Sequence, residues 1–148
     1  MKQIRSATCQ FSVEADIQHN LKWILKQIKQ AADQKADVVH FSESALSGYA
    51  GVDIPDIASL DWQELVHATR QVMDAARKHR TWVLLGSTHR LQGRHKPHNC
   101  VYVINPKGHI VSRYDKRFCT GQRGKPTHDL CHYSPGNHGS TFRVRGIV

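Results

Sequence analysis

The sequence predicts an α/β domain built on a mixed sheet, with two helices packed on one face of the sheet. Three observations predict this fold. Strand-like and helix-like segments alternate through the N-terminal half of the chain. Two further apolar segments, 100–106 and 109–116, flank an Asn-Pro turn and are typical of a hairpin. The chain has 148 residues, 39% hydrophobic and 22% charged, which is the composition of one globular domain.

The first half of the chain supplies two strands and one helix. Apolar residues scattered among polar ones in 2–12 predict a first strand. Asp16 is a suitable N-cap for the helix that follows. The apolar residues of this helix recur at steps of three, four and one, as expected for one helix face: Ile17, Leu21, Ile24, Leu25, Ile28, Ala31 and Ala32. The segment 37–41 then predicts a short buried strand.

The second half begins with a helix over 60–80. Asp61 followed by Glu64 resembles a capping box, although the usual first residue is Ser or Thr. Strands are expected at 81–90, 100–106 and 109–116, a long loop at 117–139, and a further strand from 140. The order of these elements predicts the mixed sheet.

The formal net charge of +9, with 11 histidines besides, raises the question of nucleic-acid binding. Lysines and arginines are spread along the chain, and the densest window, 113–125, also carries loop glycines. A solvated basic surface explains this pattern, so no nucleic-acid partner is expected. No apolar run approaches the roughly 18 residues of a membrane span, and the start lacks the apolar core of a signal peptide. We therefore expect a cytoplasmic protein with no membrane partner.

The four cysteines are Cys9, Cys100, Cys119 and Cys131. Their wide spacing and the missing secretion signal predict reduced thiols. A zinc site is an alternative for the loop that holds two of these cysteines and three histidines: Cys119, His128, Cys131, His132 and His138. This spacing matches no standard zinc motif, so we expect neither a metal nor another cofactor.

Two charged side chains follow predicted strands. Glu43 comes after the strand 37–41, and Lys116 closes the strand 109–116. Functional side chains gather where strands end and loops begin, so the two can point into one cleft if both strands end at the same edge. A structural ion pair at a sheet edge explains the same residues and stays open as an alternative. The Gly/Ser loop after Glu43 lets the chain turn sharply away from the strand.

Four motifs, in this order, resemble the carbon–nitrogen hydrolase (nitrilase/amidase) superfamily. They are "ATCQF" at 7–11 with Asn20 and Leu21 after it, "FSESALSGY" at 41–49, "SRYDKRFC" at 112–119 and "HYSPGN" at 132–137. The resemblance covers nearly the whole chain. It implies that residues 1–148 are the N-terminal part of such a domain, an incomplete half of a nitrilase-like α-β-β-α sandwich.

The resemblance also implies a Glu-Lys-Cys mechanism for hydrolysis of amide or nitrile carbon–nitrogen bonds. Glu43 would be the general base and Lys116 the positive partner that stabilises the tetrahedral intermediate. The family's second acid lies four positions before the aromatic residue of the Pro-Gly turn. Counting back from Tyr133 gives Asp129, an aspartate where glutamate is more usual. Tyr49 is a candidate residue of the substrate pocket.

The nucleophile is the missing member, because its family position lies just past Val148 and none of the four cysteines matches it. Cys119, three residues after Lys116, is the alternative nucleophile. We therefore expect this chain alone to be inactive. We also expect it to pair with a second copy or with a missing C-terminal half. The competing hypothesis is a catalytically inactive remnant or a binding or regulatory module. Nitriles, aliphatic amides, carbamoyl amino acids and ureido compounds all stay open as substrates.

Overall fold

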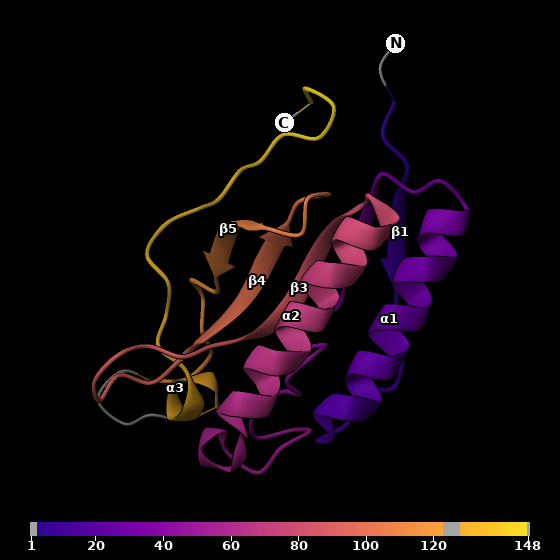
Figure 1. The fold of residues 1–148 in the computed structure, drawn as a ribbon. Coiled ribbons are helices and arrows are strands. Elements are labelled where there is room, and N and C mark those ends of the chain that lie inside the picture. Colours follow the sequence, from indigo (N-terminus) through magenta and orange to yellow (C-terminus); the bar gives the residue numbers. More distant parts are fainter. Residues whose placement is uncertain (1–2, 123–127, 148) are drawn as a thin grey trace.

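The computed structural model describes residues 3–122 and 128–147. In this part of the chain, one five-stranded sheet has the order β1-β2-β3-β4-β5, and two long helices lie side by side against it (Figure 1). The strands are β1 (Ser6–Cys9), β2 (Val38–Phe41), β3 (Trp82–His89), β4 (His98–Ile104) and β5 (Ile110–Asp115). The helices are α1 (Ile17–Asp33), α2 (Trp62–His79) and the short α3 (Asp129–His132), with a 3-10 turn, η1 (Ile57–Ser59).

The sheet is mixed, as the sequence predicts. Strands β1, β2 and β3 are parallel, while β4 and β5 form antiparallel pairs with their neighbours. Because two antiparallel steps restore the direction, β5 runs the same way as β2. The ends of these two strands therefore lie at the same edge of the sheet, although β3 and β4 separate them.

Both long helices begin where an aspartate caps them. The Asp16 carboxylate accepts hydrogen bonds from the backbone N–H groups of Gln18 and His19, and Asp61 does the same for Gln63 and Glu64. These bonds satisfy amide groups that have no partner inside the first turn. Only half of the expected capping box forms, because the Glu64 side chain accepts a hydrogen bond from Gln18 on α1 instead.

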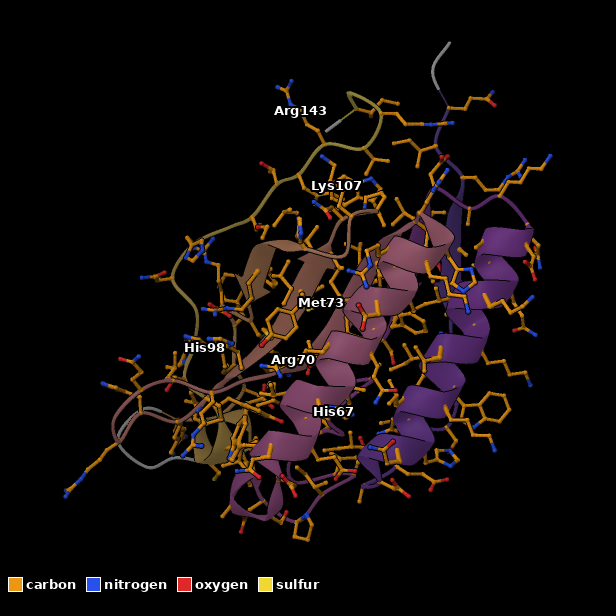
Figure 2. The ribbon with its side chains drawn as sticks, viewed as in Figure 1. His67, Arg70, Met73, His98, Lys107 and Arg143 are labelled. Carbon is orange, nitrogen blue, oxygen red and sulfur yellow. The ribbon has the colours of Figure 1, made fainter. Side chains whose placement is uncertain are left out.

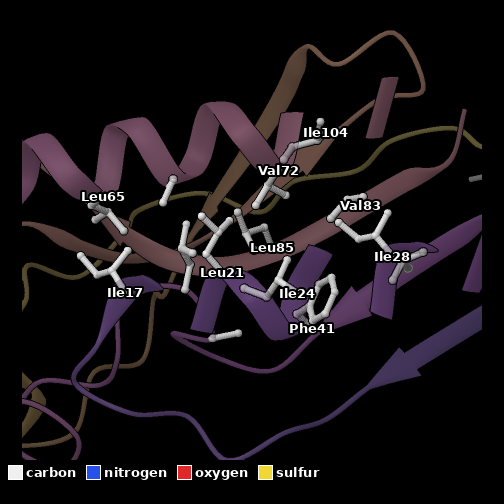
Figure 3. Packing of buried hydrophobic residues seen from close by; sticks show 14 of the residues in the cluster. Ile17, Leu21, Ile24, Ile28, Phe41, Leu65, Val72, Val83, Leu85 and Ile104 are labelled. Carbon is white, nitrogen blue, oxygen red and sulfur yellow. The ribbon is translucent and has the colours of Figure 1, made fainter. Parts of the chain in front are cut away.

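The core lies between the two helices and one face of the sheet (Figure 3). The helices contribute Ile17, Leu21, Ile24, Ile28, Leu65 and Val72, and the strands contribute Phe41, Val83, Leu85 and Ile104. Burying each such side chain stabilises the fold by roughly 1.5–3 kcal/mol relative to leaving it exposed. This packing fixes the frame on which the loops at the strand ends rest.

The opposite face of the sheet has no helix over it in the described residues. Trp82 and Leu84 of β3 point to this face, because their neighbours Val83 and Leu85 pack in the core. The segment 134–147 crosses this side: Phe142 lies against Trp82, with ring centroids 5.6 Å apart, and Val144 is buried.

Two expectations about elements are wrong. The C-terminal segment forms no regular strand, because it makes only an isolated bridge between Val144 and Ile147. The loop expected at 117–139 contains α3, whose four residues are too few for an apolar period to show in the sequence. Part of that loop, 123–127, lies outside the described residues.

Basic side chains come from different elements of the chain. Arg70 lies on α2, Lys107 in the β4–β5 turn and Arg143 in the C-terminal segment (Figure 2). None of the helices in the described part of the chain is both long and apolar enough to span a bilayer.

Candidate active site

Topology brings Glu43 and Lys116 to one end of the sheet, because one follows β2 and the other follows β5. Neighbouring strands lie about 4.8 Å apart, so three steps across the sheet separate these strands by roughly 14 Å. Side chains at the two strand ends can therefore meet only if the chain after β2 crosses β3.

Gly86 of β3 permits this crossing. A Cβ atom on residue 86 would lie 2.0 Å from the Ser42 carbonyl oxygen and 2.8 Å from the Ser44 amide nitrogen. Only glycine leaves room for backbone at this distance. The Gly86 carbonyl also accepts a hydrogen bond from the Leu46 N–H at 3.1 Å. The segment after β2 thus lies directly on β3 and carries Glu43 toward β4.

The Pro-Gly turn holds the other strand end. The Gly136 N–H donates to the Lys116 carbonyl at 2.9 Å, and a Cβ on residue 136 would lie 2.4 Å from the Asp115 carbonyl oxygen. Tyr133, which is buried, accepts a hydrogen bond from the Ala50 N–H at 2.9 Å on its hydroxyl oxygen. The turn therefore ties the loop after β2 to the end of β5.

Lys116 lies at the centre of the site. Its ammonium Nζ is 2.8 Å from Oε1 of Glu43, 3.0 Å from Oδ2 of Asp129 and 3.1 Å from the Tyr49 hydroxyl. The Tyr49 hydroxyl also hydrogen-bonds to Oδ1 of Asp129. An ammonium group has three hydrogens, so these three acceptors use its full donor capacity.

The sequence expectations thus converge in space, because Glu43, Lys116, Asp129 and Tyr49 form one cluster. The shorter aspartate reaches the ammonium because α3 begins at Asp129 and places its carboxylate beside Lys116. This carboxylate also accepts a hydrogen bond from the Thr120 N–H at 3.0 Å. Tyr49 enters the cluster through its hydroxyl, and its assignment to the substrate pocket stays a prediction.

The charges in this cluster reinforce one another. Desolvation lowers the pKa of Lys116, but the hydrogen bonds that its ammonium donates to Glu43, Asp129 and Tyr49 outweigh desolvation and raise that pKa above its ordinary value. Burial opposes ionisation of Asp129, yet hydrogen bonds from Tyr49, Thr120 and Lys116 lower its pKa to about 2. Burial and the bond to Asp129 raise the pKa of Tyr49 to about 12. At neutral pH the cluster holds an ammonium, a neutral phenol and the Asp129 carboxylate.

Asn99 of β4 is a site residue that the sequence analysis missed. Its side-chain Nδ2 donates to Oε1 of Glu43 at 2.6 Å, and its own side chain is buried. An asparagine at the start of a strand carries no sequence signal for this role, because the contact spans 56 residues along the chain. A cavity of about 270 Å³ opens beside it, lined by Glu43, Lys116, His40, Val101 and Tyr114 among others.

Three of the four cysteines in this chain have thiols whose pKa is raised. The four cysteines form no disulfide with one another. Burial raises the pKa of Cys9 and of Cys119, and raises that of Cys100 to about 12. Cys119 lies near the cluster, with its Sγ 3.7 Å from the Lys116 carbonyl oxygen, but the charge of Asp129 adds to the upward shift of its pKa. A nucleophilic thiol needs a lowered pKa instead.

The zinc alternative finds no support in the described residues. Within 3–122 and 128–147, no three side chains of His, Cys, Asp or Glu lie close enough together to hold a metal ion.

Comparison with known proteins decides the family. The family model for carbon–nitrogen hydrolases matches residues 5–145. The chain belongs to the carbon–nitrogen hydrolase family. A search of curated proteins found no match.

Solved structures of amidases share the fold. NitN amidase from Neterenkonia sp. AN1 superposes with a TM-score of 0.77 at 20% identity, over 92% of this chain and 51% of that one. A cysteine-to-alanine mutant of the Nesterenkonia AN1 amidase, from the nitrilase superfamily, gives 0.81 at 19% identity, over 97% and 52%. The same amidase as a cysteine-to-alanine mutant in complex with butyramide gives the same values. This carbon–nitrogen hydrolase chain therefore spans about half the length of these amidases.

Proposed function

We propose that this chain supplies the glutamate and the lysine of a hydrolase that cleaves carbon–nitrogen bonds of amides or nitriles. The observation that carries the proposal is the 2.8 Å contact between Oε1 of Glu43 and Nζ of Lys116, beside an open cavity. A glutamate-to-glutamine mutant of the amidase from Nesterenkonia sp. AN1 shows Michael addition of acrylamide at the active-site cysteine. We propose a cysteine nucleophile here too, supplied from outside these 148 residues.

In the proposed mechanism Glu43 takes the proton of the thiol, and the thiolate attacks the amide or nitrile carbon. The Lys116 ammonium stabilises the negative charge of the tetrahedral intermediate. The intermediate collapses when its carbon–nitrogen bond breaks, and Glu43 gives the thiol proton to the departing nitrogen, which leaves as ammonia. A nitrile first forms a thioimidate, and water must add to it before ammonia can leave. Water, deprotonated by Glu43, then hydrolyses the thioester, which releases the carboxylic acid and restores the thiol. Asp129, 3.0 Å from Nζ of Lys116, helps to hold the ammonium in place.

The hydrogen bonds that Lys116 already donates affect how its ammonium can stabilise the oxyanion of the intermediate. Its three hydrogens already have acceptors, so a developing oxyanion must replace one of them. Tyr49 is the acceptor that leaves most readily, because it is neutral and its contact, at 3.1 Å, is longer than those of the two carboxylates. Lys116 would then keep both acidic partners during the reaction.

The competing hypothesis is a binding or regulatory module without catalysis, and ammonia release separates the two. We expect the 148-residue chain alone to release no ammonia from butyramide, and the protein isolated from its natural source to release it. Alkylation with fluoroacetamide should label a cysteine other than the four of this chain. Replacing either Glu43 with Gln or Lys116 with Ala should lower the rate about 10²-fold or more.

Two results would contradict this proposal. If the natural protein binds butyramide without releasing ammonia, the chain serves binding. If the 148-residue chain is active by itself and fluoroacetamide labels Cys119, the nucleophile lies within this chain.

A further inference from the structure

Asn99 contacts both strand ends that build the site. It lies near the start of β4, where it pairs with Thr88 of β3, and only 3% of its surface is exposed. Its side-chain amide donates to Oε1 of Glu43 at 2.6 Å, and its backbone carbonyl accepts from the Lys116 N–H at 2.9 Å. One buried residue therefore connects the segment after β2 to the end of β5.

The two hydrogen bonds on Glu43 go to the same oxygen. Oε1 accepts from Asn99 and from Lys116, and among the described residues no hydrogen bond reaches Oε2. This arrangement leaves Oε2 as the oxygen that can accept a proton. It also fixes the carboxylate from two directions, so the plane of the group cannot rotate freely.

Such support matters because Glu43 is otherwise weakly held. Its side chain is 49% exposed, and a glutamate at the surface has several rotamers of similar energy. Lys116 is itself a flexible side chain, whereas Asn99 projects from the middle of a sheet with strands on both sides. The side-chain amide of Asn99 is therefore the more rigid of the two groups that hold the Glu43 carboxylate.

We propose that Asn99 is a positioning residue: it holds Oε1 of Glu43 so that Oε2 faces the reacting thiol. This inference rests on the proposed function for its catalytic meaning. The geometric part of the proposal is that Asn99 keeps Glu43 and Lys116 in contact. This part can be tested without any activity.

The test measures hydrogen exchange of the Lys116 ammonium with water by NMR of ¹⁵N-lysine-labelled chain, with the signal assigned from Lys116→Arg. Asn99→Ala should accelerate this exchange about tenfold, as expected for the loss of one hydrogen bond to a charged group. Asn99→Leu keeps nearly the same size but has no donor and adds no charge, so it should accelerate the exchange about as much as Asn99→Ala. Asn137→Ala, an exposed asparagine of the Pro-Gly turn, serves as the matched control and should change nothing.

The backbone amide of Lys116 is the internal reference, because its hydrogen bond to the Asn99 backbone carbonyl does not involve the side chain that is replaced. Faster ammonium exchange with unchanged protection of this amide supports the proposal. Unchanged ammonium exchange in both Asn99 variants overturns it. If Asn99→Ala also loses the amide protection, the similarly sized Asn99→Leu variant decides. No substrate is used, so this result and a failure of the proposed hydrolysis are distinguishable.

Discussion

At the scale of residues, the site is an ammonium surrounded by acceptors. Glu43, Asp129 and Tyr49 each contact Lys116, so two carboxyl groups and one phenol surround a single ammonium group. The lowered pKa of Asp129 shows that its ionised form is stabilised in the folded protein. Folding and ionisation of this residue are therefore linked.

Asp129→Asn should lower the free energy of unfolding at pH 7 by about 2 kcal/mol, which is what a pKa near 2 in place of 3.8 corresponds to. Because the folded pKa is depressed, this stabilisation is fully present above the unfolded value and is lost as the pH falls through the folded value. The gap between wild type and variant should therefore close between about pH 4 and pH 2. Urea unfolding at several pH values measures it, and Asp33→Asn on the exposed end of α1 is the control. A gap that stays constant down to pH 2 would contradict the linkage.

At the scale of elements, the site exists because one segment crosses a neighbouring strand. The segment after β2 lies on β3 at Gly86, and the Pro-Gly turn presses on the end of β5 at Gly136. Both contacts are closer than any side chain allows. The strands set the direction of Glu43 and Lys116, and these two glycines allow the close approach that brings their side chains together.

Gly86→Ala should therefore disturb the site more than its single methyl group suggests. A Cβ 2.0 Å from the Ser42 carbonyl forces the crossing segment off β3 and carries Glu43 away from Asn99 and Lys116. We expect a loss of about 1–3 kcal/mol in unfolding free energy, as for overpacked sites, together with faster exchange of the Lys116 ammonium. Gly139→Ala is the matched control, because its Cβ would have no atom within 4 Å. Equal behaviour of the two variants would show that the crossing is not needed.

At the scale of the whole molecule, the sheet has unequal faces. Helices α1 and α2 cover one face, while the other, within residues 3–122 and 128–147, carries only the segment 134–147 over part of its width. Apolar and aromatic side chains such as Leu84, Val101 and Tyr114 are only half-buried there. An apolar face of this kind favours association.

We predict that the 148-residue chain associates with itself or aggregates in solution. Sedimentation velocity over a range of concentrations measures this, because burial of the open face should raise the weight-average mass as concentration increases. Replacing Leu84 with Lys should reduce the association, whereas Val66→Lys on exposed α2 should not. A chain that stays monomeric at high concentration and melts cooperatively would refute the prediction.

The sequence by itself determined the sheet type, the two helices with their aspartate caps, and the fact that Glu43 and Lys116 follow strand ends. Periodicity, capping and turn chemistry are local, so these features can be read along the chain. Only the tertiary structure decided that these groups are 2.8 Å apart, that Asn99 joins them and that the short α3 carries Asp129 to the ammonium. Those contacts depend on the register of four strands, β2 to β5, and on the absence of a side chain at Gly86. No local pattern of residues encodes distances between segments that are far apart in the chain.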